Sequence, residues 1–444
     1  MAANKVKTPS EKHAAIPVES LPETLSPQKK SIWTEAQEQF HRTADLLGLD
    51  KLVRLKLSEP RRIIEVSLAP KLKHGELDAP IKAWRVQYND ARGPFKGGVR
   101  AMESVTLEDV KGLGMDMTWK CALHELPLGG AKGGIRANLS KYHPEDRETI
   151  MREYVRFISN DVGPQKDVLA PDIGTNEVDM GYMQDAFSWP AGRSLVTDVV
   201  ATARPLSIGG IAGRTGATGR GVVDTIESAA KHLGIKLDQA TAVVQGYGNV
   251  GQSTVDYLAQ DKVKVTAVSD VEGGVYNPQG LDTAKLKEWV KKHKTVKGFP
   301  GGTSISNKDL LELQCDILVP AATENQITRD NAGKIKAKII AEAANGPTTV
   351  EASDMLSKRG VFIIPDILCN GGGVVVSYLE MSQSAQLEQF TFEEVNERLK
   401  RRMDKTFNSV LALSKEKGVD MRTAAHMIAV KNVVDSMVSR GFLP

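Results

Sequence analysis

The sequence contains few cysteines, and none of them is placed for a disulfide framework or a zinc site. Cys121, Cys315 and Cys369 lie far apart in a chain of 444 residues and form no CxxC pair. The eight histidines are equally scattered along the sequence. We therefore expect a reduced protein that binds no metal.

Long apolar runs and an excess of charge of one sign are also missing. No apolar run approaches the roughly 18 residues that span a bilayer, and the start "MAANKVKTPSEKHAAIPVES" lacks the apolar core of a secretory signal. The net charge is only +3, and no stripe of Lys and Arg is interleaved with aromatics. We expect a cytoplasmic protein with neither a membrane nor a nucleic-acid partner.

The length predicts two or three domains, and composition and pattern suggest where they lie. Residues 1–32 are rich in Pro, Ser, Lys and Glu and are expected to form a flexible arm. Residues 33–195 mix strand patterns with a helix that should start at Pro144 and bury every third or fourth residue. The strand patterns stand at 63–70 and 81–89, so this part is expected to be an α/β domain.

In residues 196–420 short apolar runs alternate with amphipathic segments. Strands that are apolar on both faces and separated by helices imply a parallel, doubly wound sheet, the Rossmann-like arrangement. The apolar runs lie at 240–246, 263–270, 315–322, 337–345 and 360–365. The tail from Thr391 is helical, and its last piece, 421–444, is expected to return to the first domain.

The segment "VVQGYGNVGQ" predicts a dinucleotide site. Gly246, Gly248 and Gly251 have GxGxxG spacing directly after an apolar strand and before a helix, which is the context that gives this weak motif its meaning. The glycines permit a tight turn, close approach of a pyrophosphate and close helix packing. Asn249 and Val250, between the last two glycines, complete the predicted phosphate-binding turn.

The acid that should contact the ribose is Asp270, 24 residues after Gly246 at the end of the next strand. Glu272 follows, and residues 269–284 contain no Lys or Arg that could neutralise a 2′-phosphate. This segment favours NAD over NADP, although a cation from elsewhere in the fold would reverse the preference.

Three lysines in the first domain stand in glycine-rich or helical surroundings, and a carboxylate follows them. Lys96 lies in "GPFKGG", Lys120 in "MTWKCAL", Lys132 in "LPLGGAKGGI" and Asp172 in "APDIGTNE". The order GxxxxGK[ST] is absent, so a P-loop NTPase is disfavoured. A buried lysine crowded by cations can act as a base, and the glycines around Lys132 are expected to leave room for a substrate and the other lysines.

These motifs, together with "GRTGATGRGV" and "CNGGGVVVSYLE", resemble in kind and order the glutamate/leucine/phenylalanine/valine dehydrogenases, most closely the members that act on glutamate. The resemblance covers about residues 33–444. It implies a substrate-binding and oligomerisation domain at 33–195, an NAD(P)-binding domain at 196–420 and a homohexamer.

The resemblance also implies a role for each matching residue. Lys132 would activate water and Asp172 would exchange a proton with the substrate nitrogen, while Lys120 would bind the α-carboxylate. Lys96 and Ser377 would bind the γ-carboxylate, and Val374 would line the same pocket. The nicotinamide end of the cofactor would meet Arg214, Thr218 and Asn345.

The implied reaction is deamination of L-glutamate to 2-oxoglutarate and ammonium, with hydride transfer to NAD(P), and its reverse. Two alternatives stay open. A dehydrogenase for leucine, valine or phenylalanine is disfavoured by Lys96 and Ser377, which are apolar in such relatives. A regulatory subunit that pairs with an active homologue is disfavoured because each implied catalytic position is filled.

Overall fold

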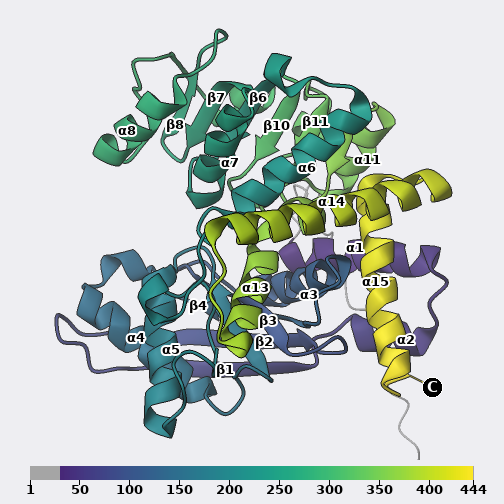
Figure 1. Cartoon of the computed structure of the whole chain (residues 1–444). Coiled ribbons are helices and arrows are strands. Elements are labelled where there is room, and N and C mark those ends of the chain that lie inside the picture. Colours follow the sequence, from purple (N-terminus) through teal and green to yellow (C-terminus); the bar gives the residue numbers. More distant parts are fainter. Residues whose placement is uncertain (1–30, 444) are drawn as a thin grey trace, which may run out of the picture. The chain divides into compact units, whose positions relative to one another are not determined.

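The computed structural model describes residues 31–443, which build two β-sheets, one from each half of the chain (Figure 1). The arm predicted at 1–32 lies outside the described residues except for Ser31 and Ile32. The first helix begins at Ile32, and Ser31 caps it by accepting a hydrogen bond from the Thr34 amide.

The first sheet contains five strands in the order β1-β2-β4-β3-β5. Its strands are β1 Arg62–Leu68, β2 Ile81–Asn89, β3 Phe95–Ala101, β4 Gly130–Ile135 and β5 Asp167–Pro171. Strand β2 runs antiparallel to β1 and β4, whereas β3 runs parallel to β4 and β5. The strands expected at 63–70 and 81–89 are present, and the segment "GAKGGI" proves to be strand β4.

Helices cover both faces of this sheet because alternate residues of each strand point to opposite sides. Trp84 and Val86 of β2 belong to the same cluster as residues of α3, while Ala83 packs with residues of α4 and α5. The helices of this part are α1 Ile32–Leu46, α2 Lys51–Leu57, α3 Leu107–Leu123, α4 Pro144–Ile158 and α5 Glu177–Ser188, with the 3₁₀ helices η1 Leu139–Lys141 and η2 Trp189–Ala191.

Helix α4 begins at Pro144, as predicted. The five apolar residues that its pattern assigns to the core are all buried, namely Ile150, Met151, Tyr154, Val155 and Ile158.

The second sheet contains seven strands in the order β12-β11-β10-β6-β7-β8-β9. They are β6 Thr241–Gln245, β7 Lys264–Asp270, β8 Gly273–Tyr276, β9 Thr303–Ile305, β10 Ile317–Pro320, β11 Ile339–Ala341 and β12 Phe362–Ile364. The five strands from β12 to β7 are parallel, as predicted. Strands β8 and β9 are antiparallel additions at one edge, and the expectation of a purely parallel sheet missed them because both are short and contain glycine or polar residues.

The parallel strands are buried on both faces, as their continuous apolar runs predicted. Val244 belongs to a cluster with residues of α6 and α7, whereas its neighbour Val243 packs with residues of α9, α10 and α11. The remaining helices are α6 Ala217–Leu233, α7 Asn249–Gln260, α8 Thr283–His293, α9 Asn307–Leu311, α10 Arg329–Ala332, α11 Val350–Lys358, α12 Asp366–Cys369, α13 Gly372–Gln386, α14 Phe392–Lys417 and α15 Met421–Ser439, with the 3₁₀ helices η3 Leu206–Ile208 and η4 Leu237–Gln239.

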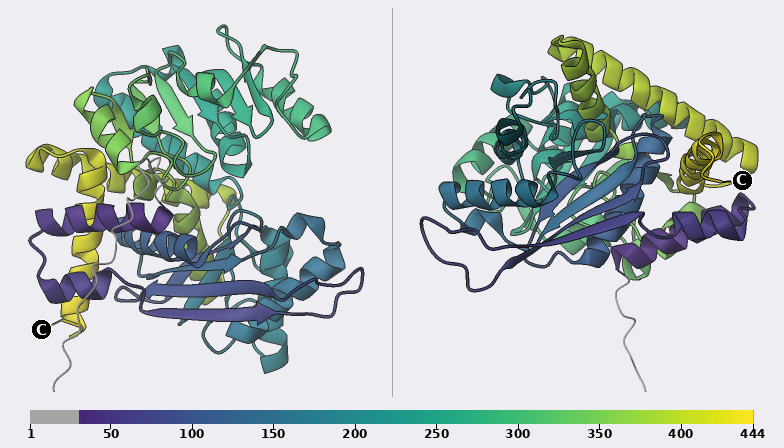
Figure 2. Two further views of the ribbon diagram at one scale, coloured as in Figure 1. Left: turned by 180° about the vertical axis from the view of Figure 1, so that it is seen from behind. Right: turned by 90° about the horizontal axis from the view of Figure 1, so that it is seen from below.

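The last helix, α15, contacts α1 and α3, and Figures 1 and 2 both show it crossing the N-terminal helices. Arg440, just after α15, donates hydrogen bonds to the carbonyl oxygens of Asp90 and Ala91 at 2.6 and 3.1 Å. The chain from Ser31 onward forms one compact unit, and the domain boundaries at 195/196 and 420/421 stay predictions. No helix in the described range is long and apolar enough to cross a membrane.

Candidate active site

A cleft of about 970 Å³ is lined by residues from both sheets and their connections. It brings together most of the residues that the sequence singled out: Lys96, Lys120, Lys132, Asp172, Arg214, Thr218, Gly248, Asn249, Val250, Asn345, Val374 and Ser377. Gly246, Gly251 and Asp270 are not in its lining. The lysine positions and the glycine motif therefore face one shared space, although they are far apart in the sequence.

Lys132 and Asp172 form an ion pair in the cleft. Lys132 lies in β4, Asp172 follows β5, and the guanidinium of Arg100 lies 3.7 Å from the Asp172 carboxylate. Burial lowers the pKa of Lys132 against the attraction of Asp172, with Arg100 and Lys120 adding to the fall. Burial alone would raise the pKa of Asp172, but Lys132 and Arg100 outweigh it and lower the value, so the carboxylate stays ionised.

Arg100 is a residue that the sequence interpretation missed. It lies in β3, four residues after Lys96, and residues separated by an even number of positions in a strand point to the same face of the sheet. That period places Lys96 and Arg100 toward the same side of the sheet, and this was the signal available in "FKGGVR".

The glycines around Lys132 serve a different purpose from the one expected. A side chain at Gly130 would come within 2.2 Å of Thr118 in α3, and one at Gly134 would come within 2.6 Å of Val110. At Gly133 it would meet the Tyr154 hydroxyl at 2.7 Å. The glycines thus let β4 lie directly against its neighbouring helices, and the interpretation that they clear space for substrate was wrong.

Lys120 connects α3 to the second sheet. Its ammonium donates to the Asn345 side-chain oxygen at 2.9 Å, and the Asn370 amide donates to the same oxygen at 3.1 Å. Asn345 follows β11, so this contact ties the lysine of one part of the chain to the carboxyl end of a parallel strand in the other. Ligands commonly bind at that edge of an α/β sheet.

Lys96 is 1% exposed, and two arginines are near enough to repel its ammonium. Its ammonium donates to the Leu169 carbonyl oxygen at 3.1 Å. Burial, with repulsion from Arg214 and Arg85, lowers the pKa of Lys96 to about 7. A buried cation so poorly compensated is suited to bind an anionic group that enters the cleft.

Arg214 lies at the same end of the cleft as Ser377, since its guanidinium Nε donates to the Ser377 hydroxyl at 3.0 Å. Ser377 is held on α13, where Glu380, one turn later, forms a fully buried ion pair with Arg204 at 3.0 Å. The Ala203 amide also donates to Glu380, at 2.7 Å. Glu380 was not singled out from the sequence, although its spacing from Ser377 places both on one side of a helix.

The glycine motif has the geometry that a dinucleotide needs. Gly246 has a φ of +93°, a side chain at Gly251 would lie 1.8 Å from the Gly246 carbonyl oxygen, and the space beside Gly248 is open. Gly248 begins α7 without a side-chain cap, so backbone amides at this helix start are left for a ligand. These residues fit a pyrophosphate at the α7 N-terminus.

Asp270 ends β7, as expected, but both carboxylate oxygens accept backbone hydrogen bonds, from Glu272 at 2.8 Å and from Val296 at 2.7 Å. The second bond holds the turn around Val296, which carries the exposed Lys294 and Lys297, against Asp270. Lys294 and Lys297 are thus within two residues of the amide that binds Asp270, so the lack of cations in residues 269–284 does not by itself decide between NAD and NADP.

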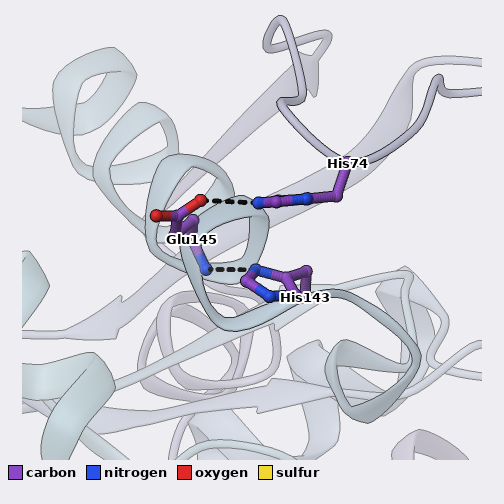
Figure 3. A group of neighbouring side chains, drawn as sticks. All are labelled: His74, His143 and Glu145. Carbon is purple, nitrogen blue, oxygen red and sulfur yellow. Dashed lines mark hydrogen bonds and ion pairs between the residues drawn. The ribbon is translucent and has the colours of Figure 1, made fainter.

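A group of three potential metal ligands lies outside the cleft lining, at the start of α4. His74 pairs with Glu145 at 2.6 Å, and the His143 ring accepts a hydrogen bond from the Glu145 amide at 3.4 Å. Figure 3 shows these three residues together. Their ligand atoms lie within 4.8 Å of one another. The Lys73 ammonium, 3.0 Å from Glu145, already supplies a cation, and hydrogen bonds from His74 and Lys73 lower the pKa of Glu145 to about 2. The expectation of a metal-free protein stays a prediction.

Comparison with known proteins adds the family. Residues 60–189 match the Glu/Leu/Phe/Val dehydrogenase dimerisation domain, and residues 209–441 match the Glutamate/Leucine/Phenylalanine/Valine dehydrogenase domain. A glutamate dehydrogenase of Thermotoga maritima is 42% identical over 94% of this chain and 100% of its own length. An NADP-specific glutamate dehydrogenase of Synechocystis sp. is 38% identical over 93% and 97%, and an NAD-specific one of Staphylococcus aureus is 40% identical over 94% and 99%.

Among solved structures, one subunit of a hetero-hexameric glutamate dehydrogenase from Thermus thermophilus, in its leucine-bound form, superposes with a TM-score of 0.89. It is 31% identical, and the match covers 94% of this chain and 99% of that one. Both sheets, the cleft between them and the matched domains lead to one conclusion: the chain belongs to the glutamate/leucine/phenylalanine/valine dehydrogenase family.

Proposed function

We propose that the protein is a glutamate dehydrogenase, which converts L-glutamate to 2-oxoglutarate and ammonium with hydride transfer to NAD(P)⁺, and catalyses the reverse reaction. The observation that carries this proposal is the position of Lys96, a buried and underpaired cation, in the same cleft as Ser377 and Arg214. The curated relatives, all glutamate dehydrogenases by name, support it.

Substrate binding would use cations at two ends. Lys120, held by Asn345, would bind the α-carboxylate, and Lys96 with Ser377 would bind the γ-carboxylate, while Val374 packs along the same pocket. The resemblance implies that Arg214 meets the nicotinamide end of the cofactor. Because Arg214 donates to Ser377, we propose that it also adds a second positive charge at the γ-carboxylate end. Two fixed contacts orient the Cα–H bond, and such positioning is a major part of the rate enhancement in bound substrates.

Proton transfer would be centred on Lys132 and Asp172. The substrate ammonium must lose a proton before hydride can leave Cα, and the Asp172 carboxylate is the acceptor held in the cleft for it. Lys132, whose pKa is lowered, would take a proton from the water that attacks the resulting imine. Asp172 would return a proton to the departing nitrogen.

The cofactor would lie across the second sheet, with its pyrophosphate at Gly246, Gly248, Asn249, Val250 and Gly251. When bound, its nicotinamide accepts the hydride. Thr218, in the first turn of α6, and Asn345 line the cleft where the nicotinamide end is expected. Asp270 would contact the adenosine ribose, and the relatives include both an NADP-specific and an NAD-specific enzyme.

The assembly is proposed to be a homohexamer, and the protein to act in the cytoplasm. A hexamer is supported by the Thermus thermophilus structure, although that assembly contains two kinds of chain. The filled catalytic positions Lys132 and Asp172 favour an active chain over the alternative of a regulatory subunit.

The test is turnover by the purified protein alone. Absorbance of the reduced cofactor is followed with glutamate as the sole substrate, with NAD⁺ and with NADP⁺, and 2-oxoglutarate and ammonium are measured as products. We expect both products in equal amounts without any added partner. No turnover with either cofactor, from folded protein, would contradict the proposal and favour the regulatory alternative.

A further inference from the structure

A second, smaller cavity of about 60 Å³ lies next to the cleft and is lined by charged side chains. A water molecule needs about 10–15 Å³ of such a cavity, so this one has room for several water molecules. Glu35 of α1, Asp116 of α3 and Glu324 after β10 line it, together with Asp366, Arg422 and His426. None of these residues belongs to the substrate contacts described above.

The wall between the cleft and this cavity is thin. Asp116 lines the cavity, and Lys120, four residues later on the same face of α3, lines the cleft. Asn345 lines the cleft, and the next residue, Gly346, lines the cavity and donates its amide to Asp366 at 2.8 Å. Glu324 lines both spaces. A polar layer about one side chain thick thus separates the substrate lysines from the cavity.

Lys132 approaches this layer from the sheet. Gly130 and Gly134 face Thr118 and Val110 of α3. Lys132 is two residues from each of these glycines in β4, so its side chain points to the same face of the sheet, toward α3. A side chain at Gly114 of α3 would lie 3.8 Å from the Lys132 amide nitrogen. Asp116, two residues after Gly114, points to another side of α3, but it is near enough to Lys132 for the charge of that lysine to lower the pKa of Asp116.

Asp116 has both acidic and basic side chains near it. Burial and the Asp366 carboxylate raise the pKa of Asp116 to about 7, while Lys120, Lys132 and Arg422 oppose the rise. Arg422 is bound to Glu342 at 2.5 Å and lies 3.5 Å from Asp366.

The other groups that face the cavity belong to three elements. Glu35 belongs to α1, and its carboxylate accepts a hydrogen bond from the Val350 amide at 3.2 Å. Glu324 follows β10. On α15, burial lowers the pKa of His426 to about 4, so its ring is neutral at pH 7. Asp116 is thus a cavity group that can exchange a proton near neutral pH.

The proposed reaction needs such an exchange. Glutamate, NAD(P)⁺ and water give 2-oxoglutarate, ammonium, NAD(P)H and one proton, and this last proton must leave the site at each turnover. A cleft that closes over the substrate excludes bulk water from the front. A path for the proton through the protein then becomes useful.

We infer that Asp116 is a proton-relay residue, which takes up the proton released at the Lys132–Asp172 pair and passes it to the water of the small cavity. The O–H bond formed on the Asp116 carboxylate breaks again when a cavity water accepts the proton, and in reductive amination the transfers run in reverse. Asp116 touches neither substrate nor cofactor, so it acts through the catalytic pair. The inference rests on the proposed function.

The test compares Asp116→Asn with the wild type, with the conservative variant Asp116→Glu, and with Glu108→Gln as a control on the exposed side of the same helix. Turnover of glutamate is measured in dilute buffer over a range of pH and then with rising concentrations of a small diffusible acid–base pair such as imidazole. Wild-type turnover is established first, so a failure of the proposed function is recognised before the variants are compared.

We expect Asp116→Asn to lower kcat about tenfold in dilute buffer with little change in the KM for glutamate, and imidazole to restore most of the loss. The ionisation near pH 7 should disappear from its kcat profile. Asp116→Glu should retain most activity, and Glu108→Gln should match the wild type.

An unchanged kcat for Asp116→Asn in dilute buffer would overturn the inference. A loss that imidazole does not restore, or one seen mainly in KM, would also overturn it, because it would show that Asp116 only supports the position of Lys120. If Asp116→Asn fails to fold, Ala36→Leu provides a second test, since Ala36 lines the cavity and a larger side chain displaces its water while Asp116 remains. The same loss, restored by imidazole, is expected, and unchanged turnover in dilute buffer would overturn the inference.

Discussion

Replacing Lys96 with methionine tests the specificity pocket most sharply. Methionine keeps much of the volume of the side chain and removes its charge. Because Lys96 is 1% exposed, the γ-carboxylate of glutamate would enter a buried site without its main partner. Removing one partner of a buried ion pair costs about 3–5 kcal/mol. Because Arg214 remains beside Ser377 and can still attract the carboxylate, we expect a cost near the lower end of that range.

A loss of about 3 kcal/mol corresponds to a fall of about 150-fold in kcat/KM for glutamate. The thermal stability should not fall with the activity, because Lys96 is repelled by Arg85 and Arg214 in the free protein. We therefore expect the thermal unfolding midpoint of Lys96→Met to be unchanged or raised. Lys82→Met, at an exposed position of β2 in the same sheet, is the matched control and should leave both quantities unchanged.

The assay compares glutamate with L-norvaline, which has a similar chain and no γ-carboxylate. We expect Lys96→Met to lose activity on glutamate and to keep or gain activity on norvaline. Equal losses on the two substrates would refute the assignment of Lys96 to the γ-carboxylate. Combining a Lys96→Leu change with Ser377→Val should shift activity further toward apolar amino acids, and unchanged glutamate turnover in that double variant would rule out the pocket.

Three further predictions concern the rest of the cleft. Lys132→Ala should reduce turnover by at least about a thousandfold while cofactor binding, followed by fluorescence of the reduced cofactor, stays near the wild-type value; substantial residual turnover would contradict its catalytic role. Gly251→Ala should lower stability and cofactor affinity together because its side chain would overlap the Gly246 carbonyl, whereas Gly248→Ala should fold normally and weaken only cofactor binding; equal unfolding midpoints for the two variants would refute this distinction. The KM for glutamate should rise by up to about tenfold per pH unit above pH 7, because the bound γ-carboxylate needs the protonated form of Lys96, and Lys96→Met should lose this dependence; the same slope in both proteins would count against it.

Much of the fold could be predicted from the sequence because its signals are local. The apolar runs at 240–246 and 263–270 became the parallel strands β6 and β7, and Pro144 marks the start of α4. The edge strands β8 and β9 could not be predicted in the same way. They are short, and their pairing with β7 depends on a neighbour rather than on an apolar pattern of their own.

The site shows the same division between local and distant information. The motif residues predicted for the cleft do line it, apart from two of the glycines and Asp270. The purpose of the glycines around Lys132 could not be read from the sequence, since it depends on which helix lies against β4. The contact of Asp270 with Val296 likewise joins residues 26 apart in the sequence, so it could not be read from the segment that follows Asp270.

The measurement that most directly tests the central claim is kcat/KM of the purified protein on glutamate, leucine, valine and phenylalanine, with NAD⁺ and with NADP⁺. The buried Lys96 and Ser377, with Arg214 beside them, predict that glutamate is preferred over each apolar amino acid by at least about a hundredfold with the better cofactor. A preference for leucine, valine or phenylalanine would contradict the assignment of that end of the cleft to a carboxylate.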